Sequence, residues 1–176
     1  MAARVLGNPN APIKVDEFVS LTCPHCADFT NETLPTIEKD YIDTGKVKFV
    51  MHDFPLDGIS LKAAAVARCM PVDEYFPFIK VLYKNQMTWA YGSADPVASV
   101  AQYAELGGLP ADQAKACAND SKLQDAIVAE RTEATDKYKV NATPTFVIND
   151  GAKVIEGAQN AQTFAAAFDQ ILAAKK

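Results

Sequence analysis

Hydrophobic and polar residues alternate in several stretches of the chain, and these stretches predict a β-sheet. Residues 13–19 are rich in Ile, Val and Phe and predict a buried strand. Residues 46–54 alternate in the same way and predict a second strand. Residues 143–148 and 152–155 flank an Asn-Asp-Gly triplet at 149–151, which is a strong β-hairpin signal.

Between the second strand and the hairpin, the hydrophobic spacing is helical and no stretch favours a strand. Proline and glycine residues separate five predicted helices. The predicted helices cover residues 60–70, 72–86, 96–106, 111–119 and 123–138. Five consecutive helices indicate a helical domain inserted into the part of the chain that carries the sheet.

Two further helices and a short strand complete the predicted elements. A helix is predicted from position 23 to Asp43, interrupted at Pro35, and Gly45 is its expected C-cap. A last helix over 161–173 carries a hydrophobic face that packs on the sheet. Residues 4–6 are expected to add an edge strand, and Met87, Trp89 and Tyr91 are expected to pack in a core or a groove.

The composition fits one globular unit and excludes several classes of protein. The chain has 176 residues, of which 49% are hydrophobic and 22% charged. A net charge of −5 argues against a nucleic-acid-binding protein, which needs a basic surface. No hydrophobic run approaches the ~20 residues of a transmembrane helix, and no secretory leader is recognisable before the first strand.

The motif Cys23-Pro24-His25-Cys26 lies where the first predicted core strand passes into a helix. Cys23 is expected at the helix N-terminus, where free N–H groups and the helix dipole favour a thiolate. A lowered pKa makes Cys23 the exposed nucleophile, and Cys26 is its buried partner. Pro24 suits the first helical turn, and His25 can add a donor or a positive charge near the Cys23 sulfur.

Half a zinc site is the competing interpretation of this motif. Structural zinc takes four ligands, usually two such cysteine pairs or one pair with two histidines. Cys69 and Cys117 are solitary and the only other histidine is His52, for which a structural or surface role is expected. The sequence therefore favours redox chemistry, with no metal and no cofactor.

Glu17 shares one face of the first core strand with Ile13, Val15 and Val19. A carboxylate in this position either lies at a solvated strand end or is buried with a chemical role. Lys46 and Lys48 are expected to be solvated, although one of them could pair with Glu17.

Three features together resemble the DsbA family of thioredoxin-fold oxidoreductases. They are Glu17-Phe18 ahead of the Cys-Pro-His-Cys motif, the sequence Ala-Thr-Pro-Thr-Phe at 142–146, and the segments Gly-Asn-Pro-Asn-Ala-Pro at 7–12 and Asp-Phe-Pro-Leu at 53–56. The resemblance covers nearly the whole chain, in the order that the family has. The segments at 7–12 and 53–56 in particular resemble the branch of the family that has a compact helical insertion.

The resemblance implies an α/β, thioredoxin-like fold with an inserted all-helical domain. The thioredoxin-like domain is expected over residues 1–55 and 139–176, and the inserted domain over 56–138. It implies a catalytic role for Glu17 as proton acceptor for Cys26. It also implies a cis peptide bond before Pro144, with the Thr143 backbone available to an extended substrate.

The remaining two cysteines, Cys69 and Cys117, allow three interpretations. They could be free buried thiols, a disulfide that staples the insertion, or a disulfide that also tunes the active pair. Relatives with a compact insertion carry two such cysteines, so the resemblance favours the structural disulfide.

The function implied is the donation of disulfides to reduced secreted proteins through Cys23 and Cys26, in the periplasm and as a monomer. A quinone-linked membrane protein is the expected reoxidising partner. Two alternatives stay open at this stage. One is a reductase or isomerase, although the N-terminal dimerisation domain of the dimeric isomerases is not expected in this chain. The other is a peptide-binding chaperone whose Cys-Pro-His-Cys motif is a structural disulfide.

Overall fold

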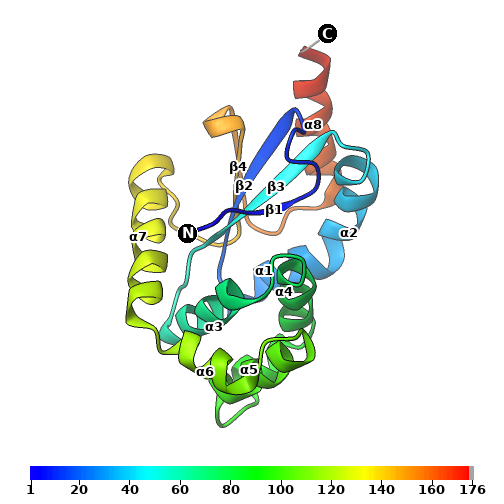
Figure 1. Cartoon of the computed structure of the whole chain (residues 1–176). Helices are drawn as coiled ribbons and strands as arrows, with labels where there is room; N and C mark the ends of the chain where they lie inside the picture. Colours follow the sequence, from blue (N-terminus) through cyan, green and yellow to red (C-terminus); the bar gives the residue numbers. More distant parts are fainter. Residues whose placement is uncertain (175–176) are drawn as a thin grey trace.

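A mixed five-stranded sheet with the order β1-β3-β2-β4-β5 forms the centre of the structure, a computed structural model that describes residues 1–174 (Figure 1). The strands are β1 (Arg4–Leu6), β2 (Ile13–Val19), β3 (Val47–Asp53), β4 (Thr145–Ile148) and β5 (Lys153–Glu156). β2 and β3 run parallel, whereas the β1–β3, β2–β4 and β4–β5 pairs are antiparallel. All five predicted strands are present, within one or two residues of their predicted bounds.

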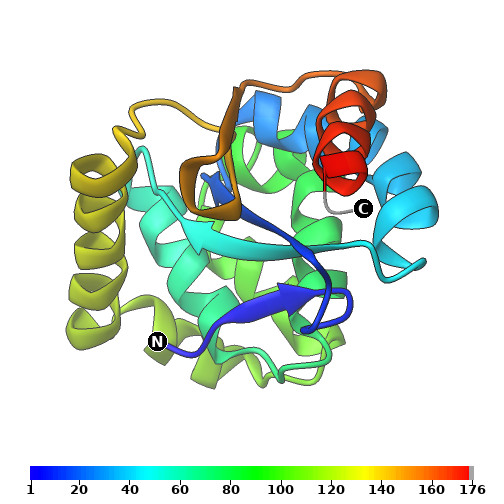
Figure 2. The same ribbon diagram turned by 90° about the horizontal axis from the view of Figure 1, so that it is seen from above.

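Eight α-helices lie around this sheet in the part of the chain that the structure describes. They are α1 (Pro24–Asp28), α2 (Leu34–Ile37), α3 (Gly58–Cys69), α4 (Tyr75–Lys84), α5 (Pro96–Leu106), α6 (Ala111–Ala118), α7 (Ser121–Tyr138) and α8 (Ala161–Ala174). Figure 1 shows α3 to α6 gathered beyond one end of the strands, whereas Figure 2 shows α7 on one side of the sheet and α2 and α8 on the other. Among the described residues, no helix is long and apolar enough to cross a bilayer.

The face of the sheet toward α2 and α8 carries an aromatic core. Phe29 lies with its ring centroid 4.4 Å from that of Phe146 and 5.3 Å from that of Phe164. Phe49 joins the cluster from β3 at 6.3 Å. All four rings are fully buried, and each such pair adds about 0.5–1.5 kcal/mol beyond the burial of area. This core fixes β2 and β4 against the helix that begins after Cys23.

The predicted helix from position 23 to Asp43 is present but irregular. Two π-helical turns, η1 (Phe29–Thr33) and η2 (Glu38–Ile42), alternate with α1 and α2. Pro35 lies in the first turn of α2, where a missing N–H is tolerated. The interruption predicted at Pro35 therefore begins one turn earlier, at η1. A third π-helical turn, η3 (Met87–Tyr91), follows α4 and lies outside the helix predicted over 72–86.

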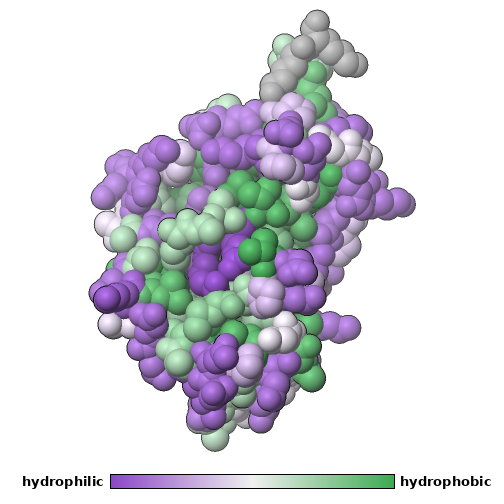
Figure 3. Space-filling view, viewed as in Figure 1, coloured by the Kyte–Doolittle hydropathy of each residue, from purple (hydrophilic) through white to green (hydrophobic). Residues whose placement is uncertain are grey.

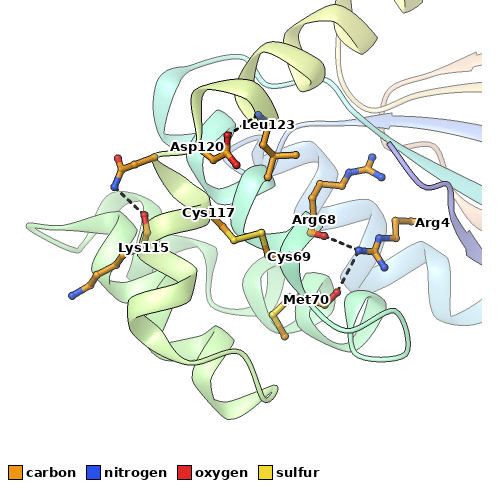
Figure 4. The surroundings of a disulfide bond; sticks show 9 residues. Arg4, Arg68, Cys69, Met70, Lys115, Cys117, Asp120 and Leu123 are labelled. Atoms are coloured by element: carbon orange, nitrogen blue, oxygen red, sulfur yellow. Dashed lines mark hydrogen bonds between the residues drawn. A yellow bond between two sulfur atoms is a disulfide. The ribbon is translucent and has the colours of Figure 1, made fainter.

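A disulfide joins the end of α3 to α6, as Figure 4 shows. The sulfur atoms of Cys69 and Cys117 are 2.04 Å apart, and 48 residues separate the two cysteines in sequence. Arg4 anchors the N-terminal strand beside it, because one guanidinium nitrogen donates to the carbonyl of Arg68 at 2.8 Å and to that of Met70 at 3.3 Å. The disulfide thus joins two of the helices that lie between β3 and β4 in the sequence.

Candidate active site

Cys23 is the N-cap residue of α1, directly after the turn that follows β2. Its backbone is extended (φ −79°, ψ 119°), and Pro24 occupies the first helical turn. The Cys23 carbonyl accepts the first helical hydrogen bond, from Ala27 N at 3.2 Å. The sulfur therefore lies at the end of a helix where backbone N–H groups are free to face it. Cys23 is only 7% exposed, so the expectation of a freely exposed nucleophile is wrong in degree.

The surroundings of Cys23 favour its thiolate. A hydrogen bond with the Cys26 thiol contributes most to lowering the pKa of Cys23, from 9.0 to about 5, against the opposing effect of burial. Hydrogen bonds from Thr143 and from the backbone N–H groups of Cys26 and His25 lower this pKa further. At neutral pH the reduced protein therefore carries a negative charge on Cys23.

Cys26 and Glu17 are both buried, and both favour their neutral forms. Burial raises the pKa of Cys26 well above its ordinary value, and the hydrogen bond with Cys23 adds to this effect. Burial also raises the pKa of Glu17 to about 8, although the charge of His52 opposes it. The Glu17 Oε1 atom is buried without a hydrogen-bond partner among the described residues. Tyr83 lies close to both groups, and its own pKa is raised by burial and then by Cys26 and Glu17.

The loop before β4 lies against the two cysteines. The peptide bond between Thr143 and Pro144 is cis, and the Cys23 thiol donates to the Thr143 carbonyl at 3.4 Å. The Thr143 hydroxyl is buried and has no other hydrogen-bond partner among residues 1–174. It can turn its proton toward the sulfur when Cys23 ionises. Segments 120 residues apart thus meet at one sulfur atom.

His25 does not place its side-chain charge beside Cys23, and neither Lys46 nor Lys48 is a partner of Glu17, a possibility that the sequence left open. The His25 side chain is 74% exposed and lies 3.7 Å from Asp28, so His25 reaches Cys23 through its backbone N–H. Neither lysine pairs with Glu17: the Lys48 ammonium donates to the Pro9 carbonyl, and Lys46 lies over the Tyr41 ring. The reason is register, because Glu17 lies beside Met51 in β3.

Several contacts of the turn before Cys23 were missed by sequence reasoning. Ser60 in α3 accepts a hydrogen bond from Leu21 N at 2.9 Å, and its hydroxyl lies 2.8 Å from that of Ser20. Asp57, the N-cap of α3, accepts from the Thr22 hydroxyl at 2.6 Å. Asp57 and Ser60 form a recognisable helix start in the sequence, but nothing there indicates that they bind the active-site turn.

Hydrophobic side chains remain exposed close to this turn. Trp89 is fully buried, as expected, whereas Met87 and Tyr91 on either side of it are 68% and 54% exposed. Leu56 and Ile59 are also exposed, at the start of the helical region. Because the Tyr91 hydroxyl donates to the Thr22 carbonyl and Leu56 N to Ser20 Oγ, Tyr91 and Leu56 border the turn that carries Cys23.

A second polar cluster lies on the opposite face of the sheet, between β3 and α7. His52 lies 2.9 Å from Asp16 and 2.6 Å from Glu130 through its two ring nitrogens, and its ring stacks on Phe18 at 4.8 Å. Burial lowers the pKa of His52, but the two carboxylates outweigh it and raise this pKa to about 9. These residues line a cavity of about 200 Å³, and Figure 3 shows a hollow floored by strongly hydrophilic residues on this face. His52 is therefore structural, as expected.

Taken together, the groups around Cys23 are suited to thiol–disulfide exchange. A stabilised thiolate accepts a hydrogen bond from a neutral thiol, and Tyr83 interacts electrostatically both with this thiol and with a buried, neutral carboxylic acid. Among residues 1–174, no three His, Cys, Asp or Glu side chains come together as a metal site. The geometry supports reversible formation of a disulfide between Cys23 and Cys26.

Comparisons with known proteins agree with this chemistry. A family model described as Thioredoxin matches residues 1–170. A Rickettsia felis protein that carries the provisional name protein-disulfide oxidoreductase is 32% identical over 148 residues, 82% of this chain and 52% of its own length. Disulfide bond formation protein D of Bacillus subtilis is 29% identical over 166 residues, 86% of this chain and 69% of its own.

Solved structures are similar over nearly the whole chain. The crystal structure of alpha-DsbA1 from Wolbachia pipientis is 33% identical and superposes with a TM-score of 0.86, covering 96% of this chain and 89% of that one. By contrast, the chain spans about half the length of the curated Rickettsia relatives. Its similarity to the Rickettsia proteins therefore extends over only part of their length.

Proposed function

The chain belongs to the DsbA family of thioredoxin-fold oxidoreductases, and from this premise we propose that it donates disulfide bonds to reduced proteins. The observation that carries the proposal is the position of Cys23 at the N-terminus of α1, with buried Cys26 one turn further on, where hydrogen bonds lower the pKa of Cys23. A pair whose reduced form is stabilised is a strong oxidant in its disulfide form.

The reaction starts from the Cys23–Cys26 disulfide. A substrate thiolate attacks Cys23 Sγ, the bond between the two enzyme sulfurs breaks, and Cys26 leaves with the electron pair and takes up a proton. A second substrate thiolate then attacks its own sulfur in the mixed disulfide and displaces Cys23 as a thiolate. The substrate dithiol is oxidised to a disulfide, and the enzyme pair is reduced by two electrons.

The stabilisation of Cys23 sets the direction of this exchange. With a pKa of about 5, ionisation stabilises the reduced enzyme at pH 7 by about 2.7 kcal/mol, since each pKa unit is worth about 1.36 kcal/mol. For a two-electron couple this corresponds to roughly 60 mV toward oxidation of the substrate. The departing Cys23 thiolate is also a good leaving group, which speeds the release of the product.

Glu17 is proposed to exchange protons with Cys26. Both groups are buried and largely neutral, and both interact electrostatically with Tyr83. A carboxylic acid with a pKa near 8 can give and take a proton at physiological pH. Glu17 would thus protonate Cys26 when it leaves the disulfide and accept its proton when the pair is reoxidised.

The substrate is proposed to dock as an extended, partly unfolded chain beside Cys23. The Thr143 carbonyl contacts the sulfur, and the exposed hydrophobic residues Leu56 and Tyr91 bind the turn that leads to it. Backbone recognition with hydrophobic contacts suits many sequences and selects for incomplete folding. We place this activity in the periplasm, where a quinone-linked membrane protein would reoxidise the enzyme.

Oxidation of a reduced, unfolded protein tests the proposal. The oxidised chain is expected to form disulfides in reduced ribonuclease stoichiometrically, with loss of one Cys23–Cys26 disulfide for each bond formed. The Cys23→Ser variant is expected to be inactive. An enzyme that fails to oxidise the substrate but rearranges scrambled disulfides would be an isomerase, and one that does neither while binding peptides would be a chaperone.

A further inference from the structure

Gln86 binds two carbonyls of the turn that leads to Cys23. Its side-chain Nε2 donates to Leu21 O at 2.8 Å and to Cys23 O at 3.0 Å. An amide nitrogen has two hydrogens, so both are used. Gln86 is only 3% exposed, and water cannot easily replace these bonds. The Cys23 carbonyl also accepts the first helical hydrogen bond of α1, from Ala27 N. Gln86 therefore helps to fix the carbonyl at which this helix begins.

Two tyrosines bind the remaining carbonyls of the same turn. The Tyr91 hydroxyl donates to Thr22 O, and the Tyr83 hydroxyl donates to Ser20 O at 3.3 Å. All four consecutive carbonyls therefore accept hydrogen bonds from side chains of one segment, the end of α4 and η3. These donors hold the turn through its backbone carbonyls, whereas the Ser20 and Thr22 hydroxyls of the turn bind Ser60 and Asp57.

The segment that carries these donors is itself firmly anchored. Trp89 is fully buried, and its indole N–H donates to Leu82 O at 2.7 Å. The backbone N–H groups of Thr88 and Trp89 both donate to Asn85 O, at 2.9 and 3.1 Å. Gln86 lies within this bonded stretch, so its amide is presented from a rigid support.

We propose that Gln86 and Tyr91 are positioning residues, which hold the Thr22–Cys23 backbone so that the Cys23 sulfur faces the N–H groups of His25 and Cys26. The sulfur reaches those groups only while Cys23 keeps its extended N-cap conformation. The donors also bind the carbonyl oxygens nearest to the thiolate. Without these hydrogen bonds, the negative ends of the carbonyl dipoles would disfavour the thiolate charge. The inference rests on the proposed function for its redox consequence and deepens it.

Two substitutions test the proposal in the otherwise unaltered protein. Gln86→Met keeps the length of the side chain and removes both donors, whereas Tyr91→Phe removes one hydroxyl from a half-exposed ring. The pH dependence of Cys23 alkylation by iodoacetamide gives the thiolate pKa, with the Cys69–Cys117 disulfide left intact. We expect the Cys23 pKa to rise by about one unit in Gln86→Met, a tenfold loss of thiolate stabilisation, and by about half a unit in Tyr91→Phe.

The glutathione equilibrium provides the second readout and should shift toward the disulfide by the same factors, roughly tenfold and threefold. Gln124→Met is the matched control: the Gln124 amide donates to Ala118 O at 2.7 Å, next to Cys117 and not at the turn that carries Cys23. It also loses a side-chain hydrogen bond to a backbone carbonyl but should leave the Cys23 pKa unchanged.

Unchanged Cys23 pKa values in the test variants would overturn the proposal, and so would an equal shift in the control. Should Gln86→Met not fold, Tyr91→Phe decides alone. The Cys23 pKa can be compared between variant and parent whether or not the parent oxidises reduced ribonuclease. A failure of the positioning role is therefore distinguishable from a failure of the proposed oxidase function.

Discussion

Replacing Glu17 by Gln tests whether this carboxyl group is held neutral inside the protein. Burial raises its pKa to about 8, from 4.5 for an ordinary glutamate. Between these two values the folded protein binds a proton that the unfolded chain has lost, so its stability falls as the pH rises. Glu17→Gln removes this dependence and leaves a neutral side chain of the same shape.

The magnitude follows from the pKa difference. At pH 7, about 2.5 pH units above the ordinary glutamate pKa, the raised pKa lowers the free energy of unfolding by about 3 kcal/mol, since each unit is worth about 1.36 kcal/mol. At pH 4 and below, Glu17 is neutral in both states and this cost is absent. An unsatisfied amide in the variant adds a constant penalty of about 1–3 kcal/mol. The free-energy difference between variant and parent should therefore change by about 3 kcal/mol between pH 4.5 and 7, in favour of the variant.

Urea unfolding of the oxidised protein from pH 4 to pH 8 measures this difference. In the oxidised protein Cys23 and Cys26 do not titrate, and other groups contribute equally to both chains. Glu156→Gln, at an exposed position at the end of β5, is the control and should show no such change. A Glu17→Gln difference that stays constant across this range would mean that Glu17 is ionised in the fold, which refutes its proposed role as proton donor to Cys26.

The remaining predictions concern His52, the buried ion pair of Arg68 with Asp53, and the Cys69–Cys117 disulfide. His52→Gln should lower the free energy of unfolding, measured in urea, by about 3 kcal/mol below pH 6.5. This loss should vanish as the pH rises through about 9, because folding raises the histidine pKa. A loss that persists above pH 9 would show that it does not come from the histidine charge. Arg68→Met should cost at least about 3 kcal/mol by the same measurement, because it leaves Asp53, bonded at 2.5 Å, buried without its partner. The Cys69→Ser/Cys117→Ser double variant should lose at most about 4 kcal/mol, from a loop of 48 residues, yet keep most of its oxidase activity; a large loss of activity would indicate a tuning role for this bond.

The sheet and the position of Cys23 could be predicted because local signals determine them. The alternation in β2 places Ile13, Val15 and Glu17 on one buried face, and Pro24 after the strand indicates where a helix starts. The hairpin triplet at 149–151 has positive φ angles at all three residues, as its composition indicates.

Other parts of the site depend on contacts between distant segments, which no single stretch of sequence reveals. Gln86 and Tyr91 look like ordinary residues after a helix, and only the packing of Trp89 brings them to the active-site turn. The missing partner of Glu17 depends on the register of β3, which places Met51 beside it and the lysines elsewhere. The first π-helical turn begins at Phe29, whose ring packs on Phe146 of β4, a contact that the local sequence does not reveal.

The equilibrium of the Cys23–Cys26 pair with glutathione decides whether this protein is a disulfide donor. Reduced and oxidised protein would be quantified by alkylation across a series of glutathione ratios at pH 7, with the Cys69–Cys117 disulfide monitored separately. A pair whose reduced form is stabilised at Cys23 should have a potential more oxidising than about −180 mV. A potential near about −270 mV, as in reducing thioredoxins, would contradict a disulfide donor.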